Sequence, residues 1–212
     1  GVNLLQTAIK DVPIQSIILG RIIFDDFYRN TLNKNKVIIE NTTSSNIKTK
    51  QNELKEKEVS IMGKEILNYC NGFWISGANE NDDEMLTIYK NIIKEKNKQN
   101  MYNKKEKSIA AIHAAESDRT VKESLKNTGK TEIERTIFTL DPDLYIHVTN
   151  PTKHDLDLLH ATNKGVVVCP RANGVLGVGF APIREMLDRG FNIAIGSDNV
   201  MLNSPDIFKE MD

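Results

Sequence analysis

The strongest constraint on the fold is a series of short apolar runs rich in Ile and Val. Most of these runs are continuously apolar rather than alternating, which is typical of strands that are covered on both faces. Segments of helical length separate most of them, and this alternation predicts an α/β fold with a parallel sheet. The six predicted strands are residues 14–20, 72–78, 108–112, 144–148, 165–170 and 192–197.

Helical patterns occupy several of the intervals between these strands. Residues 53–70 carry regularly spaced apolar side chains, and residues 82–99 are amphipathic with the acidic first turn that a helix N-terminus prefers. Thr152 is a suitable N-cap for a further helix, and residues 181–190 end at a glycine suited to the position just after a helix. We also expect a helix within residues 1–10 and the start of another after Pro205.

Six strands fit two parallel architectures. A doubly wound sheet accepts six strands, whereas a complete (β/α)8 barrel needs eight strands and about 250 residues. The chain has 212 residues, so a barrel would be incomplete. Residues 28–52 are polar and rich in Asn, Lys and Thr, and are predicted to form a long, partly mobile βα loop, within which residues 37–40 could add a short strand.

Three polar side chains stand where predicted strands end. His113 follows the apolar residues 109–112, His147 follows Ile146, and Asp198 comes after the run that ends at residue 197. Ligands bind at the carboxyl edge of parallel strands, so we expect the two imidazoles and the carboxylate to converge there. Imidazole and carboxylate together suit Zn²⁺ and similar divalent ions.

Glu116 follows His113 by three residues, which would place it just beyond a ligand. There it could take and return protons without binding the metal, while a metal-activated water with a pKa of roughly 7 acts as the nucleophile. Each residue alone also fits a structural or surface role, and the coincidence at three strand ends favours a site. His154 and His160 lie within a predicted helix and are expected to be surface residues.

Composition argues against several classes of function. The net charge is −1, and the lysines are mixed with Asn and Glu without interleaved aromatic residues, so no nucleic-acid partner is expected. Cys70 and Cys169 form no CxxC pair, which argues against a thiolate metal site. Neither a signal peptide nor an apolar run of about 18 residues occurs, so we expect a cytoplasmic protein without membrane contact.

Longer stretches of residues 108–211 resemble the amidohydrolase superfamily, especially its cytosine deaminase, chlorohydrolase and adenosine-type deaminase branch. The resemblance rests on an H-x-x-E element at 113–116, the histidine at 147, a CP-x-x-N stretch at 169–173 and a G-S-D-N stretch at 196–199. Their order and spacing match strands five to eight of that family's (β/α)8 barrel, and the preceding residues fit strands three and four by order only. The resemblance implies that residues 1–212 form one partial barrel domain.

The resemblance also implies roles for the residues at the strand ends. His113 and Asp198 would be metal ligands, and Asp198 would also shuttle the proton of the attacking water. Glu116 would protonate the departing nitrogen or a ring nitrogen of the substrate. His147 would bind the metal or polarise the tetrahedral intermediate through a hydrogen bond. The cofactor would be a divalent metal, with zinc expected and iron or manganese as alternatives.

By the same resemblance, Arg171 and Asn173 would line the substrate end of the pocket. The family usually has Ser before this Asn, and Ala172 stands there instead, so a hydrogen bond is lost or reassigned. The family's metal site also needs an H-x-H pair at the end of strand one, yet no histidine precedes His113. We therefore expect a central piece of a longer enzyme without strands one and two. Its zinc affinity should be poor, so that it could lack metal, and its exposed sheet edges should favour a homo-oligomer.

The function that the resemblance implies is metal-dependent cleavage of a C–N bond, by deamination of a nucleobase-like or nucleoside-like heterocycle. This piece by itself is expected to be inactive or nearly so. Cyclic-amide hydrolysis and dechlorination remain open within the same superfamily, as does a barrel scaffold that has lost its metal. A flavodoxin-like nucleotide-binding module fits the strand count, but the chain has no phosphate-binding loop.

Overall fold

The computed structural model describes residues 19–20 and 57–212. The helix predicted within residues 1–10, the loop predicted over 28–52 and most of the first predicted strand lie outside these described residues. The chain divides into two compact units, one of residues 1–73 and 91–108 and the other of residues 74–90 and 109–212.

The first unit contains a short parallel strand pair and two helical segments. Its described elements are β1 (Leu19–Gly20), a helix at residues 57–66, the first half of β2 (Gly72–Ile75) and the second part of α4 (Asp83–Tyr102). Leu19 pairs with Gly72 in the parallel register of β1 and β2. A side chain at Gly63 would come within 2.8 Å of Ile92 Cδ1, so the two helices pack closely at this glycine. The helices predicted over 53–70 and 82–99 are confirmed within the described residues.

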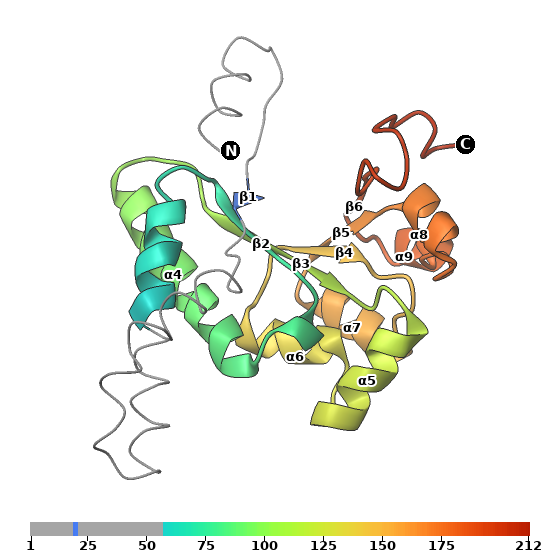
Figure 1. Ribbon diagram of the computed structural model, residues 1–212, viewed down its shortest axis with the longest axis horizontal. Helices are drawn as coiled ribbons and strands as arrows, with labels where there is room; N and C mark the ends of the chain where they lie inside the picture. The colour runs from blue at the N-terminus through green and yellow to red at the C-terminus, as the bar shows by residue number, and fades with distance from the viewer. Residues whose placement is uncertain (1–18, 21–56) are drawn as a thin grey trace. The chain divides into compact units, whose positions relative to one another are not determined.

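The second unit is built on parallel strands that follow their sequence order, from the second half of β2 to β6 (Figure 1). Its other strands are β3 (Ile109–Ala114), β4 (Leu144–His147), β5 (Gly165–Val168) and β6 (Ile193–Ile195). A doubly wound sheet reverses its strand order at a switch point, whereas a barrel keeps the sequence order all the way round. The predicted parallel α/β fold is therefore confirmed, and its strand order is that of an incomplete (β/α)8 barrel.

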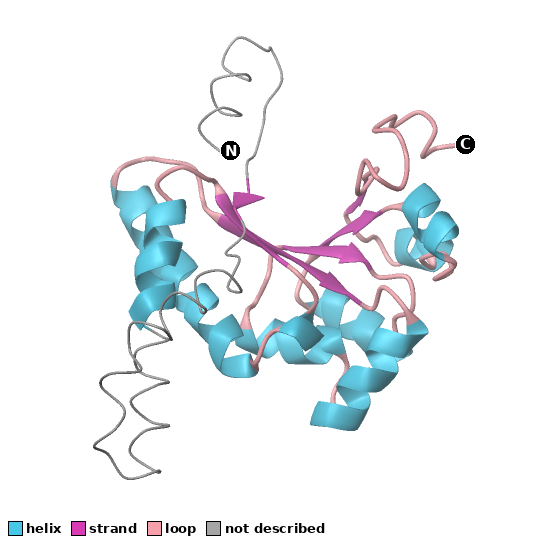
Figure 2. Cartoon of the chain, viewed as in Figure 1, coloured by secondary structure: helices cyan, strands magenta, loops and turns pink. Residues whose placement is uncertain are grey.

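Helices connect successive strands of this unit, and Figure 2 shows several of them gathered on one side of the strands. They are the one-turn η2 (Ala78–Glu80), α5 (Asp118–Thr128), α6 (Glu132–Thr139), α7 (Lys153–Ala161), α8 (Pro170–Leu176) and α9 (Ile183–Asp188). Neither α5 nor α6 is among the helices predicted from the sequence, although the buried Ile133 and Ile137 of α6 lie one helical turn apart. Their signals are caps: the Ser117 side chain accepts from Thr120 N–H, the Thr131 side chain accepts from Glu134 N–H, and Gly129 ends α5 at φ 73°.

The helix predicted after Pro205 is wrong, because residues 207–210 form a turn. Glu210 is buried, and its Oε2 accepts the backbone N–H of Arg171 at 3.0 Å. This bond holds the turn against the beginning of α8.

The core of the second unit lies between the strands and the helices. Ile112, Tyr145 and Val166 stand side by side on consecutive strands, and none is more than 1% exposed. Burying side chains of this size contributes about 1.5–3 kcal/mol each. The Tyr145 hydroxyl lies 2.9 Å from Thr136 Oγ1 of α6, so this face of the sheet is the one that the helices cover. No helix in the described part of the chain is both long and apolar enough to cross a bilayer.

Candidate metal centre

Regular strand geometry would keep the two strand-end histidines apart. In the parallel register His113 is level with Ile146, and Ala114 is level with His147. Side chains alternate between the faces of a strand, so His147 would share the face of Tyr145, which is turned toward α6. His113 would then lie on the opposite face.

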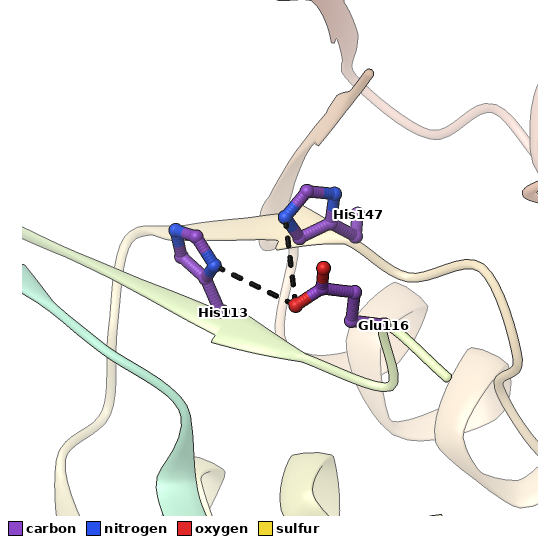
Figure 3. A group of neighbouring side chains, drawn as sticks. All are labelled: His113, Glu116 and His147. Carbon is purple, nitrogen blue, oxygen red and sulfur yellow. Dashed lines mark ion pairs between the residues drawn. The ribbon is translucent and has the colours of Figure 1, made fainter. Parts of the chain in front are cut away.

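The backbone at the end of β4 overrides this alternation. His147 and Val148 have φ values of 74° and 48°, in the left-handed region that side chains other than glycine rarely adopt. The turn brings the two imidazoles together, with ring centroids 4.8 Å apart and planes at 75° (Figure 3). Ala115, just after β3, is left-handed as well, with φ 52°. Backbone strain of about 1–3 kcal/mol per residue is typical of functional sites, and here it accompanies the contact between His113 and His147.

Glu116 completes a group of three side chains. Its Oε2 lies 3.9 Å from His113 Nδ1 and 3.9 Å from His147 Nε2, and the three ligand atoms all lie within 4.8 Å of one another (Figure 3). His113 is the main influence that lowers the pKa of Glu116, against the opposing effect of burial. At 3.9 Å this influence is an attraction between charge and imidazole rather than a formed hydrogen bond. Glu116 is therefore ionised at neutral pH.

The hydrogen bonds around His147 determine its tautomer. Asn173 Nδ2 donates to Thr149 Oγ1 at 3.0 Å, so Asn173 Oδ1 is the atom that accepts from His147 Nδ1, also at 3.0 Å. The Nε2 lone pair of His147 is then left facing Glu116. Burial lowers the pKa of His147, which keeps the ring neutral. A neutral imidazole whose other nitrogen donates to an amide oxygen is prepared for metal binding.

Buried nitrogen atoms without hydrogen-bond partners also support a metal site. His113 Nε2 and His147 Nε2 are both buried and have no hydrogen-bond partner within the described ranges. Buried polar atoms are nearly always paired, so two unpaired nitrogens in contacting rings call for an explanation. Of these two nitrogens only His147 Nε2 faces Glu116, because His113 presents its Nδ1 to that carboxylate. Two imidazoles beside one carboxylate form a donor set that fits a divalent cation. His113, Glu116 and His147 are the residues that could hold it, although the sequence predicts that Glu116 acts on protons without binding the metal.

Asp198 stands near this group without being one of its three members. It follows β6 in a left-handed conformation, with φ 59°, and its charge raises the pKa of His147 against the dominant effect of burial. Its backbone also hydrogen-bonds the Cys169 thiol, whose pKa burial raises to about 12. Asp198 thus lies at the same edge of the sheet as the histidines, and its role as a metal ligand stays a prediction.

The two residues expected to contact substrate are both engaged within the chain. Asn173 is 1% exposed and binds His147 and Thr149 as described above. Arg171 Nη1 lies 3.3 Å from the Ser204 carbonyl and 3.5 Å from Glu210 Oε1. Their substrate-binding roles stay predictions, and the structure adds an orienting bond from Asn173 to His147.

Trp74 is a neighbour of the site that the sequence pattern does not single out. Its ring packs edge-to-face with His113 at a centroid distance of 5.3 Å, and it is the only tryptophan of the chain. The run 72–78 predicts a strand there, but pattern alone cannot say which of its side chains meets a histidine from the next strand. Trp74 is therefore a natural optical reporter of events at His113.

Comparison with known proteins gives consistent matches. A model of the amidohydrolase family matches residues 2–212. A protein of Methanothermobacter thermautotrophicus, named as a candidate aminohydrolase, is 35% identical over 214 aligned residues, which are 100% of this chain and 46% of that protein. A 5-methylthioadenosine/S-adenosylhomocysteine deaminase of Caldanaerobacter subterraneus is 35% identical over 97 residues, which are 44% of this chain and 22% of the deaminase. The chain thus spans less than half the length of these relatives.

A solved structure agrees at the level of the fold. An adenosine deaminase from Xanthomonas campestris with bound zinc superimposes with a TM-score of 0.55. The match covers 66% of this chain and 30% of the deaminase, with 22% sequence identity. At this identity the likeness shows the shared fold alone.

Proposed function

Because the chain belongs to the amidohydrolase family, we propose that it serves metal-dependent hydrolysis of a carbon–nitrogen bond. The observation that carries the proposal is the meeting of His113, Glu116 and His147, in which the buried His147 Nε2 faces Glu116 and has no hydrogen-bond partner among the described residues. Zinc is the ion we expect, since neutral imidazole and carboxylate suit it and a structural neighbour binds it.

We propose a nucleobase-like or nucleoside-like heterocycle as the substrate and ammonia as the product. The support comes from a relative named as a 5-methylthioadenosine/S-adenosylhomocysteine deaminase and from the adenosine deaminase that shares the fold. A cyclic amide or a chlorinated heterocycle is the alternative substrate class within the family.

Each residue of the site would have its own role in such a reaction. His113, His147 and Glu116 would hold the cation, which when bound makes a water molecule nucleophilic at neutral pH. Asn173 keeps the lone pair of His147 Nε2 directed into the site. Glu116, ionised through its lowered pKa, is suited to accept a proton from the water and pass it to the departing nitrogen. Asp198 would be a second base at the same edge.

The bond changes balance without a further reagent. The water oxygen adds to the amidine carbon of the ring, and its protons pass through carboxylates to nitrogen. The carbon–nitrogen bond then breaks, ammonia leaves, and a carbonyl remains on the ring. No oxidant or reductant takes part.

Ammonia release tests the proposal. The chain is stripped with a chelator, reloaded with Zn²⁺ and incubated at high concentration with 5-methylthioadenosine, S-adenosylhomocysteine or adenosine. We expect slow, zinc-dependent ammonia release, which Glu116→Gln lowers by about 10²-fold or more. Glu123→Gln, an exposed change on α5, is the matched control. Release that persists without zinc, or in the Glu116→Gln variant, would count against the proposal.

Metal analysis separates the enzyme from a scaffold. A barrel that has lost its metal should bind no stoichiometric zinc, and His113→Ala should change nothing. Zinc that binds at one equivalent and is lost in His113→Ala supports the enzyme. Chloride release from a chlorinated triazine, measured in parallel, tests the alternative substrate class.

A further inference from the structure

Glu132 is a buried acidic side chain outside the three-residue group. It lies in the first turn of α6 and is only 3% exposed. Among the residues that the structure describes, it makes no ion pair at all. A buried carboxyl group is costly unless hydrogen bonds satisfy it, so its partners indicate what it stabilises.

The main-chain partner of Glu132 is Ala115, the residue just before Glu116. Glu132 Oε2 accepts the Ala115 N–H at 3.0 Å. Ala115 has a φ of 52°, a conformation that alanine avoids unless its surroundings impose it. The bond from Glu132 is thus made to a backbone position that needs support.

The other side of the same residue is held from the segment after β4. The Ala115 carbonyl accepts the N–H groups of Thr149 at 2.9 Å and Asn150 at 2.8 Å. Asn150 Nδ2 also donates to the Glu116 carbonyl at 3.1 Å and to the Val178 carbonyl at 3.0 Å. The turn that carries Glu116 is therefore fixed from both sides.

This turn decides where the Glu116 carboxylate lies. His113 is anchored in the ladder of β3, so the only backbone between it and Glu116 is Ala114 and Ala115. Releasing Ala115 to an ordinary conformation would redirect the chain after β3. Glu116 Oε2 could then no longer stay 3.9 Å from both imidazoles.

We propose that Glu132 is a positioning residue, which holds Ala115 left-handed and thereby keeps the Glu116 carboxylate between His113 and His147. The proposal rests on the proposed function only in assigning a use to this three-residue group. It assigns Glu132 no contact with metal or substrate.

The first test uses the metal-free chain and the imidazole nitrogen NMR shifts at one fixed pH. Glu116→Gln should move the shifts of His113 and His147, and Glu132→Leu should move them comparably. Glu132→Gln keeps an amide oxygen that can accept the Ala115 N–H and should leave them close to native. Glu134→Gln, on the same helix, is the matched control. Unchanged shifts in a folded Glu132→Leu variant would overturn the proposal.

A second test asks whether the effect runs through Ala115. Ala115→Gly adopts a positive φ without help. In that background Glu132→Leu should perturb the imidazole shifts less than it does alone, and an equal perturbation would overturn the proposal. If Glu132→Leu alone does not fold, the shifts of the double variant are compared with those of Ala115→Gly. They should agree closely, and a large difference would overturn the proposal.

Zinc titration of the same variants distinguishes the two proposals. Loss of a supporting hydrogen bond at a metal site costs about 10–100-fold in affinity, which we expect for Glu132→Leu and not for Glu134→Gln. A native chain that binds no zinc even at saturating zinc concentration would count against the proposed function. The metal-free shifts would still decide the role of Glu132.

Discussion

Replacing Asn173 should weaken metal binding through His147. Asn173→Ala removes the acceptor that lies 3.0 Å from His147 Nδ1, in a place where the two side chains are 1% and 0% exposed. A buried N–H without a partner costs about 1–3 kcal/mol of stability. The ring can then turn or change tautomer, and losing such a partner lowers metal affinity about 10–100-fold, or about 1.4–2.7 kcal/mol of binding free energy.

The fluorescence of Trp74 provides the assay. Trp74 is the only tryptophan and its ring lies 5.3 Å from that of His113, so Cu²⁺ or Co²⁺ bound at the site should quench its emission. Titration of the native chain, Asn173→Ala and Asn173→Asp gives the three affinities. Asn173→Asp keeps an acceptor and should bind the metal at least as tightly as Asn173→Ala. The exposed Asn127→Ala on α5 is the matched control.

Two results would refute this reasoning. One is an unchanged metal affinity in a folded Asn173→Ala variant. The other is a loss that Asn127→Ala reproduces. If Asn173→Ala instead weakened only substrate binding, the substrate-contacting role implied by the family resemblance would be the correct one.

Three further outcomes follow from the same structure. Burial lowers the pKa of His147, so the unfolded chain binds more protons than the folded one. The free energy of unfolding should therefore fall as the pH drops through about 6.5. Urea melts at several pH values should show this dependence on pH in the native chain and a weaker dependence in His147→Asn. Gly129→Ala should cost about 1 kcal/mol in the same melts, because Gly129 caps α5 at φ 73°. Within the described sheet β6 has no strand beyond it and Ile195 is 38% exposed, so the chain should self-associate through this edge. Sedimentation that shows only monomer at high concentration would contradict this, as would self-association that Ile195→Lys leaves unchanged.

Much of the fold could be predicted because its signals are local. Continuous apolar runs identify buried parallel strands, and His113, His147 and Asp198 each follow one of them, so their shared edge follows from the strand direction. The helices α5 and α6 are short and are not among those predicted from the sequence, although Ser117 and Thr131 cap their beginnings and Ile133 and Ile137 give α6 a buried face.

The sequence by itself determined which residue types reach the edge of the sheet. Only the tertiary structure decided that they meet. Strict alternation would put the His147 ring on the helix-covered face, and it is the left-handed backbone at residues 147 and 148 that turns it toward His113. Asn173 and Glu132 lie 26 and 17 residues from the groups that they orient. Such contacts depend on how strands and helices pack over long separations in the chain, and no local pattern encodes them.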